Sequence, residues 1–327
     1  MATGLAPASS PASASPVPGP AMPRSDNLTG ALLMMGSMAA FTFNDAMIKS
    51  LSGTVPLFQV LFLRGTITTL LVAVIAWRMG ALGRRLPRDD RWPVLWRIVG
   101  EIGSAYFFLT ALFNMPIANV SAIMQALPLA ITLAAAVVFR EPVGWRRMAA
   151  ILAGFAGVML IVRPGTEGFN IYSVYGLAAV AFVTLRDLAT RRLSHEVPSM
   201  LVTLITSASL MVVFGLASVP QGWAPVDGRA ALLIGGAAVM LIGGYLFSIM
   251  VMRVGEIAVV APFRYTSLLW ALLLGWVVFG DWPEPVTLAG AALVVASGVF
   301  TLMREARISR RARAARRKEL SLGPRPR

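Results

Sequence analysis

The stretch NDAMIKSLSGTVP at residues 44–56 returns in a related form as RDLATRRLSHEVP at residues 186–198. The second copy lies 142 residues after the first and keeps an acid, a base four residues later and a final Val-Pro pair. The two acids are Asp45 and Asp187. This agreement predicts that the chain consists of two halves of similar build.

A second pair of similar stretches supports the repeat. IGSAYFF begins at Ile102 and IGGYLFS begins at Ile242, an offset of 140 residues. Identical residues recur at this offset as far as Phe139 in the first half and Phe279 in the second. The two offsets differ by two residues, which a small change in one loop would produce.

The chain is far more apolar than a soluble protein. It has 327 residues, of which 57% are hydrophobic, and a mean hydropathy of +0.73, whereas soluble domains are about 45–50% apolar. The excess lies in segments of about 20 residues, the length that crosses a bilayer core. Ten such segments are expected, at roughly 29–49, 55–77, 94–114, 117–139, 147–164, 171–192, 199–219, 229–252, 257–279 and 285–303. The predicted fold is an all-α membrane protein with ten transmembrane helices in two five-helix repeats.

The net charge of +14 is unevenly placed. Most basic residues fall in the tail after the last segment and in every second loop, and these regions share one side if the helices alternate. The positive-inside rule makes that side cytoplasmic, so both termini are expected in the cytoplasm. Since each half has an odd number of helices, the two repeats are expected to be inverted. Transporters with inverted repeats carry the substrate path at the repeat interface.

Four parts are expected along the chain: a disordered cytoplasmic tail at 1–27, repeats at 28–164 and 165–303, and a basic cytoplasmic tail at 304–327. Small residues recur one turn apart at 150–157 and 290–298 and predict close helix packing. The basic charge is expected to contact lipid headgroups. Nucleic-acid binding is not expected, because no aromatic platform or binding fold accompanies the charge.

Catalytic and cofactor chemistry is not indicated. The chain has no cysteine, and it lacks a phosphate-binding glycine loop, a nucleophile–base pair and a cluster of metal ligands. We therefore expect no enzyme activity, no metal, no cofactor and no ATP-driven step.

Charged residues inside apolar segments are candidates for function, because burying charge in a bilayer is costly. One interpretation is a polar cavity for substrate, lined by Arg64, Glu101, Arg264, Tyr265, Tyr106 and Gln125. The alternative is a set of structural ion pairs, in which Arg64 pairs with Glu101, or Arg264 pairs with Glu101 or Asp187.

The repeat helps to sort these residues. Asp45 and Asp187 recur in both halves and are interpreted as structural polar residues. Arg264 corresponds to Met124, so its charge is asymmetric and favours a role with substrate. Its planar guanidinium suits a carboxylate, a phosphate or a flavin-type carbonyl edge. Tyr245 and Trp270 are interpreted as packing or interfacial residues.

Four stretches carry a resemblance to a known family: NDAMIK at 44–49, FLRG at 62–65, VVFREP at 137–142 and APFRYTSLLWALLLGWVVFGDWPE at 261–284. With the ten segments and the repeat, they resemble the EamA-type branch of the drug/metabolite transporter superfamily over residues 28–303. The Asn-Asp pair at 44–45 and the run Pro-Phe-Arg-Tyr at 262–265 are similar to those of bacterial riboflavin importers and S-adenosylmethionine uptake carriers.

The resemblance implies a secondary transporter of the bacterial inner membrane, monomeric or homodimeric, with a small polar or aromatic metabolite as substrate. Riboflavin import is the leading expectation. S-adenosylmethionine uptake and export of amino acids or related metabolites are the alternatives. A non-transporting membrane scaffold belongs to a different class, and the two similar halves with buried charge argue against it.

Overall fold

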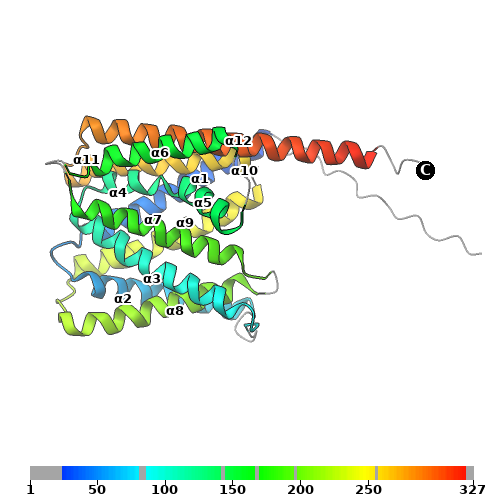
Figure 1. Ribbon diagram of the computed structural model, residues 1–327. Helices are drawn as coiled ribbons and strands as arrows, with labels where there is room; N and C mark the ends of the chain where they lie inside the picture. Colours follow the sequence, from blue (N-terminus) through cyan, green and yellow to red (C-terminus); the bar gives the residue numbers. More distant parts are fainter. Residues whose placement is uncertain are drawn as a thin grey trace, which may run out of the picture.

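The computed structural model describes residues 24–80, 86–140, 144–165, 169–194, 197–254 and 257–321, and the regular structure within them is entirely helical (Figure 1). The helices of the first half are α1 (Arg24–Lys49), α2 (Leu57–Arg78), α3 (Arg91–Asn114), α4 (Ile117–Met124), α5 (Leu127–Val138) and α6 (Trp145–Val162). Those of the second half are α7 (Ile171–Arg191), α8 (Ser199–Ser218), η1 (Val219–Gln221), α9 (Gly228–Val254), α10 (Ile257–Val260), η2 (Ala261–Tyr265), α11 (Thr266–Phe279) and α12 (Pro285–Ser321).

Among the described residues, ten stretches are long and apolar enough to cross a membrane, which confirms the predicted fold class. Residues 1–23 and 322–327, which belong to the two predicted tails, lie outside the described part of the chain. The rest of the second tail is helical, because α12 continues to Ser321 and extends past the ends of its neighbours (Figure 1).

The fourth and ninth membrane segments are interrupted, whereas the sequence predicted continuous helices over 117–139 and 257–279. The fourth breaks between α4 and α5, and the ninth passes through the 3-10 helix η2. Proline explains the position of each break, since it has no N–H to donate to the carbonyl four residues earlier. Pro128 leaves the carbonyl of Met124 free where α4 ends, and Pro262 lies at the start of η2.

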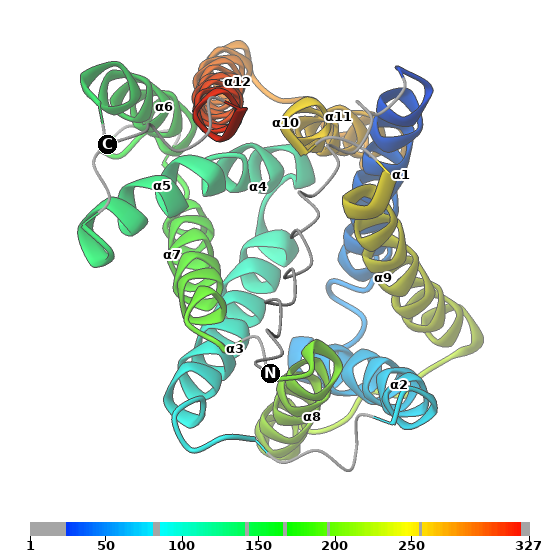
Figure 2. The same ribbon diagram turned by 90° about the vertical axis from the view of Figure 1, so that its right-hand side faces the viewer.

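The packing of the helices reflects the repeat. α1 packs along α9, α3 along α7, α2 along α8 and α6 along α12, and Figure 2 shows these four pairs around the bundle. In the repeat, α1 corresponds to α7 and α3 corresponds to α9. The contact of α1 with α9 is therefore the repeat equivalent of the contact of α7 with α3. In the other two pairs, α2 with α8 and α6 with α12, each helix packs on its own counterpart in the other repeat. Every pair therefore joins one repeat to the other.

Individual contacts repeat in the same way. A Cβ atom on Gly103 would lie 2.3 Å from the ring of Phe182, and one on Gly244 would lie 2.7 Å from the ring of Phe41. Both partners of the second contact are 141 residues from those of the first, which is within one residue of the two offsets found in the sequence. Glycine at both places lets an aromatic ring rest on the helix backbone.

Basic residues at the ends of equivalent helices also make equivalent contacts. Nζ of Lys49, at the end of α1, lies 5.3 Å from the ring centroid of Phe279. The guanidinium of Arg191, at the end of α7, lies 5.8 Å from the ring centroid of Phe139. Each is a cation–π contact between repeat-related partners. Lys49 also donates to the carbonyls of Leu112 and Met115, at 3.0 and 2.8 Å, and so caps the end of α3.

Candidate functional site

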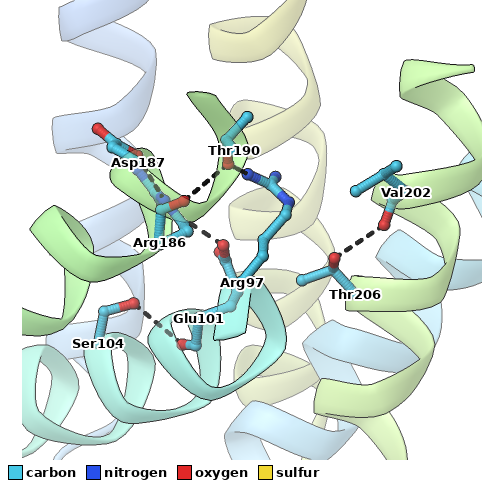
Figure 3. A network of polar contacts seen from close by, with 8 residues as sticks. All are labelled: Arg97, Glu101, Ser104, Arg186, Asp187, Thr190, Val202 and Thr206. Carbon is cyan, nitrogen blue, oxygen red and sulfur yellow. Dashed lines mark hydrogen bonds and ion pairs between the residues drawn. The ribbon is translucent and has the colours of Figure 1, made fainter. Parts of the chain in front are cut away.

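An ion-pair network joins α3 to α7 inside the bundle (Figure 3). Nη1 of Arg186 lies 3.5 Å from Oε2 of Glu101, and Nε of Arg186 donates to Oδ1 of Asp187 at 2.9 Å. The side chains of Glu101 and Arg186 are 21% and 24% exposed. One arginine thus holds two carboxylates, and all three groups keep some access to solvent.

A second contact between the same helices supports this network. Arg97 donates to the hydroxyl of Thr190, and Thr190 donates to the carbonyl of Arg186 at 2.7 Å (Figure 3). Arg97 lies one turn before Glu101 on α3, and Thr190 lies one turn after Arg186 on α7. The two helices are therefore held at two successive turns.

Arg64 belongs to a second polar group, between α1 and α2. Its Nη1 lies 3.3 Å from Oδ1 of Asn44, and Nδ2 of Asn44 donates to Oδ1 of Asp45 at 2.9 Å. Asp45 and Glu101 both attract Arg64 electrostatically. The carboxylate that the sequence offered as a partner for Arg64, that of Glu101, forms its direct ion pair with Arg186 instead.

Tyr245 of α9 connects the two groups. Its hydroxyl lies within electrostatic range of Arg64, Glu101, Arg97 and Arg186, which come from α2, α3 and α7. The residue nevertheless remains 49% exposed. A tyrosine that is half exposed among four ionisable groups borders accessible space rather than a packed core. Sequence reasoning placed Tyr245 with the packing residues, and its position in the repeated IGGYLFS stretch was the available signal.

The two interrupted membrane segments contact each other at their breaks. Nε2 of Gln125, directly after α4, donates to Oγ of Ser267 at the start of α11, at 2.6 Å. These residues are 142 positions apart, within two residues of the repeat offset. Gln125 is buried and Ser267 is partly buried, so the bond links the two breaks inside the bundle. Breaks at corresponding places of the two halves are typical of transporter binding sites.

Arg264 lies within the second break, in η2. Within the described part of the chain its guanidinium forms no hydrogen bond and no ion pair. It is attracted electrostatically by Asp187 and repelled by Arg186. The structural alternative, a direct pair of Arg264 with Asp187 or Glu101, is therefore absent among the described residues. An arginine within a membrane segment that lacks a fixed partner is suited to a ligand.

Tyr265, the neighbour of Arg264, points elsewhere. Its residue is buried, and its hydroxyl lies so close to α12 that a Cβ atom on Gly298 would be 1.7 Å from it. No hydrogen-bond partner for this hydroxyl is found among the described residues. The hydroxyl of Tyr265 is therefore directed at α12 rather than at the ion-pair network of α3 and α7.

Tyr106 belongs to a cluster of aromatic rings beside the network. Its ring centroid lies 5.9 Å from that of Phe58, 5.1 Å from that of Phe107 and 6.4 Å from that of Tyr175. Phe107 in turn stacks on Phe182 at 5.4 Å, with 18° between the planes. The charged groups thus adjoin a surface of aromatic rings from α2, α3 and α7.

Three arginines and three carboxylates are concentrated here, namely Arg64, Arg186, Arg264, Asp45, Glu101 and Asp187. In the part of the chain that the structure describes, no three His, Cys, Asp or Glu side chains gather as metal ligands would. The arrangement offers hydrogen-bond donors, charges of both signs and aromatic faces, which are the properties of a binding site for a small organic molecule.

Comparison with known proteins agrees with the repeat. The sequence profile of the EamA-like transporter family matches residues 28–163 and again residues 170–303. A riboflavin transporter of Vibrio cholerae is 28% identical over 290 residues, covering 88% of this chain and 97% of that protein. The pseudopaline exporter CntI of Pseudomonas aeruginosa is 26% identical, with 80% and 93% covered. An S-adenosylmethionine uptake transporter of Rickettsia felis is 25% identical, with 85% and 94% covered.

Solved structures also resemble the chain in fold, among them one crystal structure. Its TM-score is 0.59 at 23% identity, and the match covers 86% of this chain and 98% of that one. The likeness concerns the arrangement of the helices only.

Proposed function

Since the chain belongs to the EamA-like transporter family and is a membrane transporter, we propose that it is a secondary transporter that imports riboflavin. The substrate class that we infer is a small metabolite with a polar edge and an aromatic body. Alternating access would expose the site to each side of the membrane in turn. The inverted repeats suit this mechanism, because each half can adopt the conformation of the other.

The observation that carries the proposal is that, among the described residues, Arg264 has no ion-pair or hydrogen-bond partner, whereas Arg64 and Arg186 have partners. Arg186 is held by Glu101 and Asp187, and Arg64 is held through Asn44 next to Asp45. Arg264 is the arginine of this group without a fixed partner among the described residues. Its donor fork suits the two carbonyls of a flavin ring, and the rings around Tyr106 suit the flavin face.

The same charges argue against a cationic substrate. S-adenosylmethionine carries a positive sulfonium group, and an arginine without a fixed counter-ion would repel it. Its uptake remains the second candidate, because Asp45 and Glu101 supply negative charge and a relative bears that name. Export is the alternative direction, since another relative is named an exporter.

The orientation that we propose places both termini in the cytoplasm and the protein in the bacterial inner membrane. It rests on the distribution of basic residues between alternate loops. The site residues that we propose for substrate are Arg264, Arg64, Glu101, Tyr106 and Gln125, and we add Tyr245 because it lies near four charged groups. Tyr265 is left out of this proposal because its hydroxyl is directed at α12.

Uptake of labelled riboflavin, S-adenosylmethionine and an amino-acid mixture into cells that express the protein tests the proposal. Riboflavin accumulation above that of cells with an empty vector is expected, with Arg264→Ala as the inactive control. Accumulation of S-adenosylmethionine alone would select the second candidate. Faster loss of a preloaded compound from expressing cells would show export.

A further inference from the structure

A groove lies between the start of α6 and the part of α12 that leaves the bundle. Its first part has a volume of about 350 Å³ and is lined by Arg146, Phe300, Met303, Arg304, Arg307 and Ile308. A second hollow of about 410 Å³ shares Arg146 and Phe300 with it and is completed by Trp145, Ala149, Ala150, Ala296 and Ser297. The two hollows form one continuous groove, here called the α6–α12 groove.

One end of the α6–α12 groove is strongly basic. Arg146, Arg304 and Arg307 line it together. Nη1 of Arg304 is buried and has no hydrogen-bond partner among the described residues. The N-terminus of α6 is at the same place, and Gly144 supplies no side-chain cap for it. Free donors, arginines and a helix N-terminus together favour an anion such as a phosphate group.

The other end is apolar and faces outward. Trp145 is 75% exposed and Phe300 is about half exposed. Ala149 and Ala296 are also exposed, and the buried Ala150 and Ser297 complete the lining. Both helices belong to membrane-spanning stretches, which run from Trp145 and as far as Ile308. Arg146, Arg304 and Arg307 therefore lie at the level of the lipid headgroups, with Trp145 beside them. Ala149 lies about one turn further along α6, and Ala296 lies about two turns before Arg304 on α12, so this part of the groove lies deeper, among acyl chains.

We propose that the α6–α12 groove binds one anionic phospholipid, with its phosphate held by Arg146, Arg304 and Arg307 and an acyl chain along Ala149 and Phe300. Charge complementarity selects an anionic headgroup, since each basic residue near the surface favours anionic lipid. The apolar extension at membrane depth selects a lipid over free phosphate. α6 and α12 are the last helices of the two repeats, so a lipid here would stabilise the contact between them.

The test compares full-length purified protein in mixed micelles that contain phosphatidylglycerol or phosphatidylcholine. Thermal stability and native mass spectrometry report binding. The groove variant is Arg146→Gln/Arg304→Gln/Arg307→Gln. The matched control, Arg78→Gln/Arg88→Gln/Arg91→Gln, removes the same charge from exposed positions at the end of α2, in the turn before α3 and at the start of α3. Ala149→Phe places a large side chain in the apolar part of the groove and leaves all arginines in place.

Phosphatidylglycerol is expected to stabilise the wild type and the control variant, and the groove variant is expected to bind it at least about tenfold more weakly. Ala149→Phe should weaken phosphatidylglycerol binding and leave any effect of inorganic phosphate unchanged. Equal responses of the groove and control variants would overturn the proposal in favour of general charge attraction. Stabilisation by inorganic phosphate equal to that by the lipid would overturn it in favour of a simple anion site. If the groove variant does not fold, the single variants Arg304→Gln and Ala149→Phe replace it. Each should bind phosphatidylglycerol more weakly than the control variant does, and equal binding would overturn the proposal.

Discussion

Gly157 of α6 and Gly290 of α12 approach so closely that a Cβ atom on Gly157 would lie 2.7 Å from the carbonyl oxygen of Gly290, and one on Gly290 would lie 2.6 Å from that of Gly157. The sequence predicted close packing in both segments from their small residues, and the structure shows that the two segments pack on each other. This contact joins the last helices of the two repeats. In a bilayer the hydrophobic effect does not drive helices together, so close packing of small residues is what stabilises such a contact.

Gly157→Ala is therefore expected to destabilise the protein. The new methyl group would clash with the carbonyl oxygen of Gly290, a main-chain atom that cannot change rotamer. Overpacking of this kind costs about 1–3 kcal/mol, and the gain in helix propensity from glycine to alanine, about 1 kcal/mol, offsets only part of it. Thermal unfolding in detergent measures the change. Gly235→Ala is the control, since a Cβ there meets nothing within 4 Å. Equal melting temperatures for both variants would contradict the close contact.

Arg264→Ala should lower substrate affinity about tenfold to a hundredfold, the effect of losing a charge-assisted hydrogen bond. Folding should survive, because no described residue loses an ion-pair partner. Arg264→Lys should recover affinity in part, since it restores the charge without the planar fork. Binding to the purified variants, measured with their melting temperatures, separates the two roles. Unchanged affinity with a large loss of stability would make Arg264 structural.

Arg186→Gln should behave in the opposite way and chiefly destabilise the protein. It leaves Glu101 and Asp187 without their shared partner, and breaking a fully buried pair costs about 3–5 kcal/mol. A smaller loss is expected here because the pair is partly exposed. A double-mutant cycle with Glu101→Gln measures the coupling by unfolding. Additive effects of the two substitutions would show that the pair contributes nothing.

Ser267→Ala should destabilise the contact between the interrupted helices by about 1–3 kcal/mol, because the buried amide of Gln125 loses its acceptor. The double variant Gln125→Leu/Ser267→Ala removes both polar groups and should recover much of the stability. Its transport rate should still be reduced if the bond positions the two breaks. Melting temperature and uptake, measured in parallel, distinguish these effects. Normal uptake by the double variant would exclude a role in transport.

Reporter fusions test the proposed inversion of the repeats. A fusion after Arg327 is expected to report the cytoplasm, and a fusion in the loop after Gln221 is expected to report the opposite side, because an odd number of spans separates them. The measurement is the ratio of a periplasmic to a cytoplasmic reporter activity. The same side for both fusions would contradict the inverted arrangement.

The sequence by itself determined the membrane class, the ten spans, the repeat and the set of charged residues inside the spans. These follow from segment length and composition, since a chain in lipid must satisfy its backbone hydrogen bonds within each helix. The tertiary structure decided how those residues combine. Glu101 pairs with Arg186 rather than with Arg64, Tyr265 turns toward Gly298, and Tyr245 joins the charged group. Hydropathy sets the depth of a residue but not the rotation of its helix or the neighbour that it meets, and the packing of helices distant in sequence supplies both.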